Sequence, residues 1–108
     1  MIADPGMLRH RVILQQPVRT SDGTGGSDLT FADVATVWAA VEPLRPTLRL
    51  EADQPSERLP LEVTIRFRAD IASGWRILHF NRALEVEQTH DPDERRAWLV
   101  CTVWEEGR

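Results

Sequence analysis

The stretch Leu61-Glu-Val-Thr-Ile-Arg-Phe-Arg68 decides the fold class, because apolar and polar side chains alternate along it without interruption. Successive side chains of a β-strand point to opposite faces, so this period of two predicts a strand with one face against a core. Arg9–Val18 repeats the pattern, with Val12, Leu14 and Val18 on its apolar side. We therefore expect a mainly β protein. Its expected inward-facing residues are Leu61, Val63, Ile65, Phe67, Val12, Leu14, Leu99 and Val103.

Three further strands follow from the same reasoning. They are Trp75–Phe80, Ala83–Thr89 and a last strand, Ala97–Trp104, which is entered from the turn-rich His90-Asp-Pro-Asp-Glu94. Asn81-Arg82 is expected to make a tight hairpin between the first two, since Asn tolerates the positive φ that such turns need.

Asp33–Leu44 is ambiguous, because its apolar residues recur at a helical spacing. Its valines, threonine and tryptophan nevertheless favour a strand. The preceding Ser21–Asp28, with three glycines, has the composition of a hairpin tip that would join this segment to Arg9–Val18. The segment is therefore expected to be a strand and the second half of a long hairpin.

The connection from Glu42 to Leu61 holds four of the seven prolines. Within it, Thr47 is expected to cap a short helix that Pro55 ends. A long connection of this kind is either functional or a plain surface loop, and the sequence leaves both open.

Composition limits the class of protein. A chain of 108 residues fits one domain, expected over 8–108, with Met1–Met7 as a flexible tail that leaves both methionines open as the initiator. The net charge of −4 argues against a dedicated nucleic-acid-binding protein. Cys101 is the only cysteine, and no signal peptide or membrane helix is present, which favours a cytoplasmic origin without membrane partners.

No pattern of catalytic residues is found. The spacings of His10, His79 and His90 match no metal motif, so each is expected to be a surface or strand-edge residue. Cys101 falls on the apolar side of the last strand, where a buried, inert thiol is expected. The sequence therefore predicts no enzyme activity, no metal and no cofactor.

The order of four segments resembles the head–tail joining proteins of tailed bacteriophages, also called head-closure or stopper proteins; gene transfer agent particles are built with similar parts. The resemblance covers residues 8–105. The segments are Leu8-Arg-His-Arg-Val12, Asp33-Val-Ala-Thr-Val-Trp-Ala-Ala-Val-Glu-Pro43, Glu62-Val-Thr-Ile-Arg-Phe-Arg68 and Asp91-Pro-Asp-Glu-Arg-Arg96. One departure is Arg82, where such proteins commonly have glycine.

The resemblance implies a small antiparallel β-barrel of about six strands, with a long hairpin and one short helix in a central loop. It also implies a ring of six or twelve copies in the particle neck, assembled in the host cytoplasm between the portal–adaptor proteins and the tail terminator or tube. Such a ring closes the channel for packaged double-stranded DNA and docks the tail. A tail-completion protein and a small β-barrel module that binds a ligand or peptide remain alternatives.

Two sets of residues are expected to carry this function. The first set, which would gate the channel, is Arg45, Pro46, Thr47, Leu48, Arg49, Leu50, Glu51, Ala52, Asp53 and Gln54. Within it, Arg45 and Arg49 either contact phosphate or pair with Glu42, Glu51 or Asp53. The second, an assembly hairpin tip expected to become ordered on assembly, is Ser21, Asp22, Gly23, Thr24, Gly25, Gly26, Ser27 and Asp28.

Overall fold

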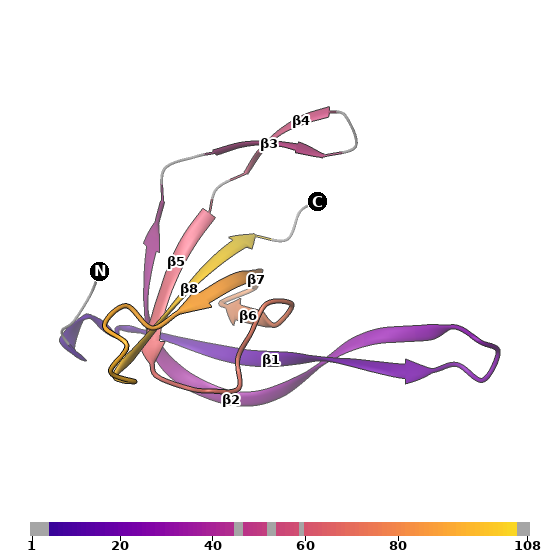
Figure 1. Ribbon diagram of the computed structural model, residues 1–108, viewed down its shortest axis with the longest axis horizontal. Helices are drawn as coiled ribbons and strands as arrows, with labels where there is room; N and C mark the ends of the chain where they lie inside the picture. Colours follow the sequence, from indigo (N-terminus) through magenta and orange to yellow (C-terminus); the bar gives the residue numbers. More distant parts are fainter. Residues whose placement is uncertain (1–4, 45–46, 52–53, 59, 106–108) are drawn as a thin grey trace.

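The computed structural model describes residues 5–44, 47–51, 54–58 and 60–105 (Figure 1). In chain order the elements are a single 3-10 turn η1 (Pro5–Met7) and the strands β1 (His10–Ser21), β2 (Ser27–Pro43), β3 (Thr47–Glu51), β4 (Gln54–Arg58), β5 (Pro60–Arg66), β6 (Arg76–His79), β7 (Arg82–His90) and β8 (Trp98–Glu105).

Six of the strands close into a barrel in the order β1-β2-β5-β8-β7-β6. Closure follows from β1, which pairs with β2 on one side and with β6 on the other, and every pairing is antiparallel. A closed sheet leaves no unpaired barrel edge, so each strand can bury one face in a common interior. The expected mainly β fold of about six strands is confirmed.

The interior contains the residues that the alternating pattern selects. Val12, Leu14, Val63, Ile65 and Val103 have no exposed surface, and Leu61 and Leu99 are exposed by 6% and 4%. Phe67 is different: it follows the end of β5 and packs only partly buried against the core. The period of two therefore predicts the core well, but it does not show where a strand leaves the barrel.

A long two-stranded arm projects from the barrel and runs to the right in Figure 1. β1 and β2 pair from His10↔Ala39 out to Ser21↔Ser27. β6, however, pairs with β1 only up to Gln15, and β5 pairs with β2 only from Ala40. The outer halves of β1 and β2 thus form the arm, which accounts for the 49 Å long axis of the molecule. The expected strand at Asp33–Leu44 and the long hairpin are confirmed.

The expected short helix from Thr47 to Pro55 is wrong. β3 and β4 pair with each other from Thr47↔Arg58 to Glu51↔Gln54 and form a two-stranded sheet of their own. Leu48 and Leu50 are two positions apart with Arg49 between them, which is the period of a strand. Pro55 is compatible with such a sheet because each strand has a free edge that needs no N–H donor.

The hairpin between β6 and β7 also differs from expectation. His79 pairs with Arg82, so the two turn residues are Phe80 and Asn81. The positive φ of 60° falls on Phe80, not on Asn81. The turn is therefore displaced by one residue, and its left-handed position holds a bulky aromatic residue, where Gly is normally preferred.

Candidate assembly surfaces

The tip of the arm is organised by one carboxylate. Oδ1 of Asp22 accepts hydrogen bonds from the backbone N–H groups of Thr24 (2.8 Å) and Gly26 (3.1 Å) and from the Thr24 hydroxyl (2.9 Å). These bonds stabilise the ionised carboxylate, and they lower the pKa of Asp22 below its usual value of 3.8. All residues of the expected assembly tip, Ser21–Asp28, are exposed. Their ordering on assembly stays a prediction.

A polar cluster holds the base of the arm against the barrel. The side-chain amide of Gln15 donates to Asp33 Oδ1 at 2.6 Å, and Gln15 Oε1 accepts from Arg76 Nε of β6 at 2.9 Å. The Arg76 guanidinium also lies 3.9 Å from the ring centroid of Phe31. Gln15 is only 7% exposed, so little water is available to replace the hydrogen bonds of its amide. This root cluster links both arm strands to β6.

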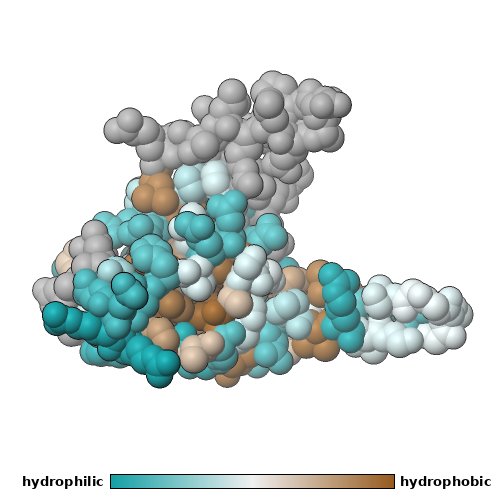
Figure 2. Space-filling model, in the orientation of Figure 1, coloured by the Kyte–Doolittle hydropathy of each residue, from teal (hydrophilic) through white to brown (hydrophobic). Residues whose placement is uncertain are grey.

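The register of β1 and β2 shifts at the root cluster. Leu14 pairs with Ala35 but Gln15 pairs with Asp33, so Val34 is an extra residue on β2. Such a bulge bends and twists a strand. It leaves Val34 38% exposed, and Leu29, further along the arm, is 47% exposed. Figure 2 shows hydrophobic surface along the arm between the barrel and its pale tip.

The expected gating segment lies in the β3–β4 hairpin. Thr47–Glu51 is strand β3 and Gln54 begins β4, whereas Arg45, Pro46, Ala52 and Asp53 lie outside the described residues. The hairpin begins and ends at neighbouring barrel positions. Pro43 pairs with Leu61, and the N–H of Leu44 donates to the carbonyl of Pro60 at 2.9 Å. The β3–β4 hairpin is thus inserted between β2 and β5, whose ends are paired with each other; we call this paired junction the closed base of the hairpin.

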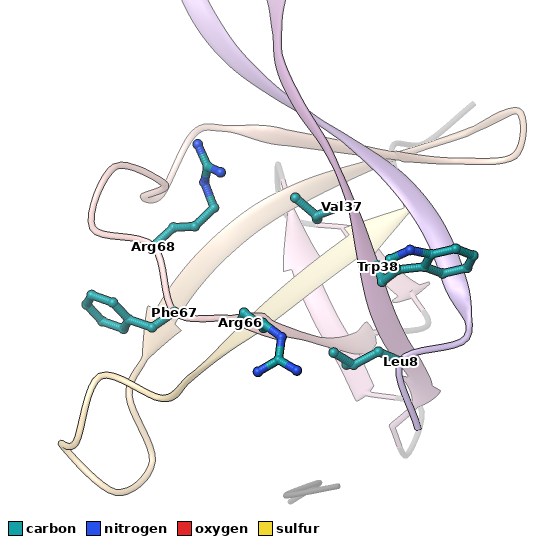
Figure 3. A pocket seen from close by; sticks show the side chains of 6 residues that line it. All are labelled: Leu8, Val37, Trp38, Arg66, Phe67 and Arg68. Atoms are coloured by element: carbon teal, nitrogen blue, oxygen red, sulfur yellow. The ribbon is translucent and has the colours of Figure 1, made fainter. Parts of the chain in front are cut away.

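Trp38 lines two surface grooves, which sequence reasoning missed. The first has a volume of about 240 Å³; its lining is Leu8, Val37, Trp38, Arg66, Phe67 and Arg68 (Figure 3). In Figure 3, Val37 and Trp38 point to opposite sides of β2. The second groove measures about 470 Å³, and its lining is Arg9, His10, Arg11, Ile13, Thr36, Trp38, Leu78 and Phe80.

Two large aromatic side chains are exposed at these grooves. Trp38 is 51% exposed and has the Arg11 guanidinium 4.8 Å from its ring centroid, while Phe80 is 81% exposed. Phe80 therefore has two separate costs in the free chain: its positive φ, a strained position that costs about 1–3 kcal/mol, and the contact of its ring with water. A signal for Trp38 was present in the sequence. On a strand it lies opposite in parity to Val37, Ala39 and Val41, and therefore faces outward.

Of the three histidines, His90 is exposed and His10 is part-exposed at the start of β1, as expected, but His79 differs. His79 is not a surface residue: it is 6% exposed, and its Nε2 lies 3.3 Å from His10 Nδ1. Burial, followed by the charges of His10 and Arg82, lowers the pKa of His79 below 6.5. Among the described residues, no group of three or more His, Cys, Asp or Glu side chains could hold a metal ion.

Cys101 lies in the core as expected, and burial raises the pKa of its thiol to about 12. A thiol with this pKa is protonated at neutral pH and is a poor nucleophile.

In the described part of the chain, no helix is long and apolar enough to cross a membrane. Exposed apolar side chains gather at the grooves and along the arm, and surfaces of this kind mark sites of protein–protein contact.

These features define a small β-barrel from which two hairpins extend. The sequence matches the phage head completion protein family over residues 3–107, so the chain belongs to that family. Its role is therefore structural, in completing the head of a phage-type particle. No curated protein matches the chain.

Solved structures share the fold. A chain in the virion of a native gene transfer agent particle superimposes with a TM-score of 0.76 at 22% identity, covering 93% of this chain and 96% of that one. A protein from Shigella flexneri 2a, solved in solution, gives 0.71 at 24% identity over 98% and 99%. The xkdH protein of the phage-like element PBSX from Bacillus subtilis gives 0.53 at 16% identity over 88% and 92%.

Proposed function

We propose that the chain is a stopper: copies form a ring between the portal–adaptor and the tail, close the DNA channel after packaging and dock the tail. The observation that carries this proposal is the β3–β4 hairpin on its closed base. Because Leu44 and Pro60 are already joined by a hydrogen bond, the barrel does not need the hairpin for its own closure. In a ring, one such hairpin per subunit would be repeated around the axis and could occlude the channel.

Gating would be a hinge motion of β3–β4 about the Leu44–Pro60 base while the barrel stays rigid. The chemistry at the channel would come from the gating segment, including Arg45 and Arg49. The two proposed roles of these arginines are phosphate contact and pairing with neighbouring acids. They predict different effects of Arg→Gln substitution on DNA retention. Loss of phosphate contacts should weaken DNA retention most at low salt and make retention less dependent on salt, whereas loss of pairing should not change the salt dependence.

The test uses particles that lack this protein, complemented with variants. The structure allows a clean deletion: residues 45–59 are removed and Leu44 is joined to Pro60 by Asn-Gly, which suits a two-residue hairpin turn. A second variant keeps the length but replaces the segment with Gly and Ser. We expect both proteins to enter the particle and the heads to lose DNA before tails are added, while the parent chain restores DNA-filled, tailed particles.

Heads that incorporate the deletion variant and retain DNA as well as the parent would contradict the gating role. If instead the parent chain restored tails without affecting DNA retention, the protein would be a tail-completion protein. If it entered no particle and bound a small ligand or peptide, it would be a binding module.

A further inference from the structure

We propose that the arm of one subunit docks in the Trp38 grooves of the next, so that this contact is the head-to-tail interface of the ring. The inference rests on the proposed function and specifies which surfaces of the chain meet. Its first basis is the groove surface. Of the described residues that line the two grooves, none is acidic and four are arginines, of which Arg68 is paired with Asp70; the chain as a whole has a net charge of −4.

The groove residues are also of the types that dominate protein–protein contacts. Trp38 and Arg11 form a stacked pair, and tryptophan and arginine are enriched among residues that carry most of the binding free energy. Phe80 holds a bulky ring 81% exposed in a turn with positive φ. A partner that covers this ring removes its contact with water without requiring any change in the turn.

The arm has the complementary properties. From Thr20 to Leu29 its only charged side chains are Asp22 and Asp28, with Arg19 one position below them. Leu29 and Val34 offer exposed apolar side chains along the same arm. A two-stranded ribbon is marginally stable in water unless it packs against another surface, and the root cluster supports only its base. The acidic and apolar side chains of the arm therefore complement the basic and aromatic side chains of the grooves.

Geometry makes the contact intermolecular. Trp38 pairs with Arg11 at one end of the β1–β2 ribbon, and Ser27 pairs with Ser21 at the other. Ser21 lies ten positions along β1 from Arg11, a distance of about 33 Å at roughly 3.3 Å per residue. The arm of a chain therefore does not reach its own grooves. Two different patches on one chain make a heterologous interface, which closes into a ring when the rotation permits.

Tryptophan fluorescence gives a direct reading of groove occupancy. Trp38 is 51% exposed, whereas Trp75, Trp98 and Trp104 are exposed by 8% or less. Acrylamide should therefore quench mainly Trp38 in the dilute chain, and Trp38→Phe should remove most of this quenching. As the full-length chain is concentrated to about 1 mM, we expect sedimentation to show larger species and the quenchable fraction to fall in parallel. A chain that stays monomeric with Trp38 quenchable at this concentration would overturn the proposal.

Charge reversal identifies the occupant. Arg11→Glu and Asp28→Arg, both at exposed positions, should each weaken self-association about tenfold or more, because each opposes like charges across the interface. The double variant Arg11→Glu/Asp28→Arg should recover most of the loss, since the altered arm again meets an opposite charge. The matched control is Arg11→Glu/Glu42→Arg, which has the same net charge but alters an exposed residue far from the arm tip. Equal association of these two double variants would overturn the arm as occupant.

The same variants in particles separate this inference from the proposed function. If the parent chain restores DNA-filled heads and both single reversals restore them equally well, the stopper role stands and the arm contact is overturned. If the parent chain restores no DNA-filled heads, the stopper role fails, and the self-association measurements still decide on the arm contact.

Discussion

The inner and outer halves of the β1–β2 ribbon belong to one pair of strands but follow different rules. In the barrel half, Val12 and Leu14 have no exposed surface and their positions are fixed by burial. In the arm half, every residue from Arg19 to Thr30 is exposed, and the conformation depends on pairing, on turn chemistry and on the root cluster. The comparison teaches that hydrophobic alternation specifies where the barrel is, whereas local polar contacts specify what projects from it.

The largest expected effect comes from making one substitution in both halves. Leu14→Ala removes a fully buried side chain and should lower the free energy of unfolding by about 2–5 kcal/mol. Leu29→Ala removes a side chain that is 47% exposed, and should change it by about 0.5 kcal/mol or less. Urea unfolding of the two variants measures the difference. Similar midpoints for both would mean that the two halves are not energetically distinct.

The root cluster lies between these extremes. Gln15→Ala removes the acceptor of Arg76 and the donor to Asp33, which should cost about 1 kcal/mol, because Asp33 is exposed and Arg76 is part-exposed, so water can replace the lost hydrogen bonds. The neighbouring Gln16 is exposed, so Gln16→Ala is a matched control with little expected effect. Residual dipolar couplings should also show a changed arm orientation in Gln15→Ala. An unchanged midpoint and orientation would show that the arm does not depend on this cluster.

The residue pattern was sufficient for a mainly β fold and for the existence of the arm, whereas closure into a barrel was implied by the family resemblance. Period-two alternation identified the inward residues of β5 and β8, and the glycine-rich Ser21–Asp28 identified the hairpin. The β3–β4 hairpin was missed because prolines and a possible cap at Thr47 outweighed the two-residue spacing of Leu48 and Leu50. The grooves could not be predicted, because they depend on which strands become neighbours around the barrel.

The buried His79 gives the barrel a pH dependence in the range where histidine titrates, whereas the shifted carboxylate of the arm, Asp22, titrates below 3.8. Its pKa is lowered below 6.5 in the folded state by burial and by the charges of His10 and Arg82. The unfolded chain therefore binds the proton more readily. Stability should be full above about pH 6.5, the value for an unperturbed histidine, and should fall as the pH drops through the lowered pKa.

Urea midpoints measured between pH 5.5 and 7.5 test this dependence. His79→Gln should flatten the profile, whereas substitution of the exposed His90 by Gln should leave it unchanged. A profile that keeps its slope in His79→Gln would assign the pH dependence to another group.

The smallest effect on stability, and the most local one, is expected at the arm tip. Asp22 is fully exposed, but its Oδ1 accepts three hydrogen bonds within the turn. Asp22→Ala removes this acceptor, so Gly23–Gly26 should gain freedom while the unfolding midpoint of the barrel stays the same. Asp22→Asn is the matched variant, because its side-chain carbonyl can still accept the same bonds without the charge. Backbone ¹⁵N order parameters should fall at the tip in the alanine variant and stay near the parent values in the asparagine variant. Equal order in all three chains would mean that strand pairing alone holds the tip, and a fall in both variants would mean that the charge is what the turn requires.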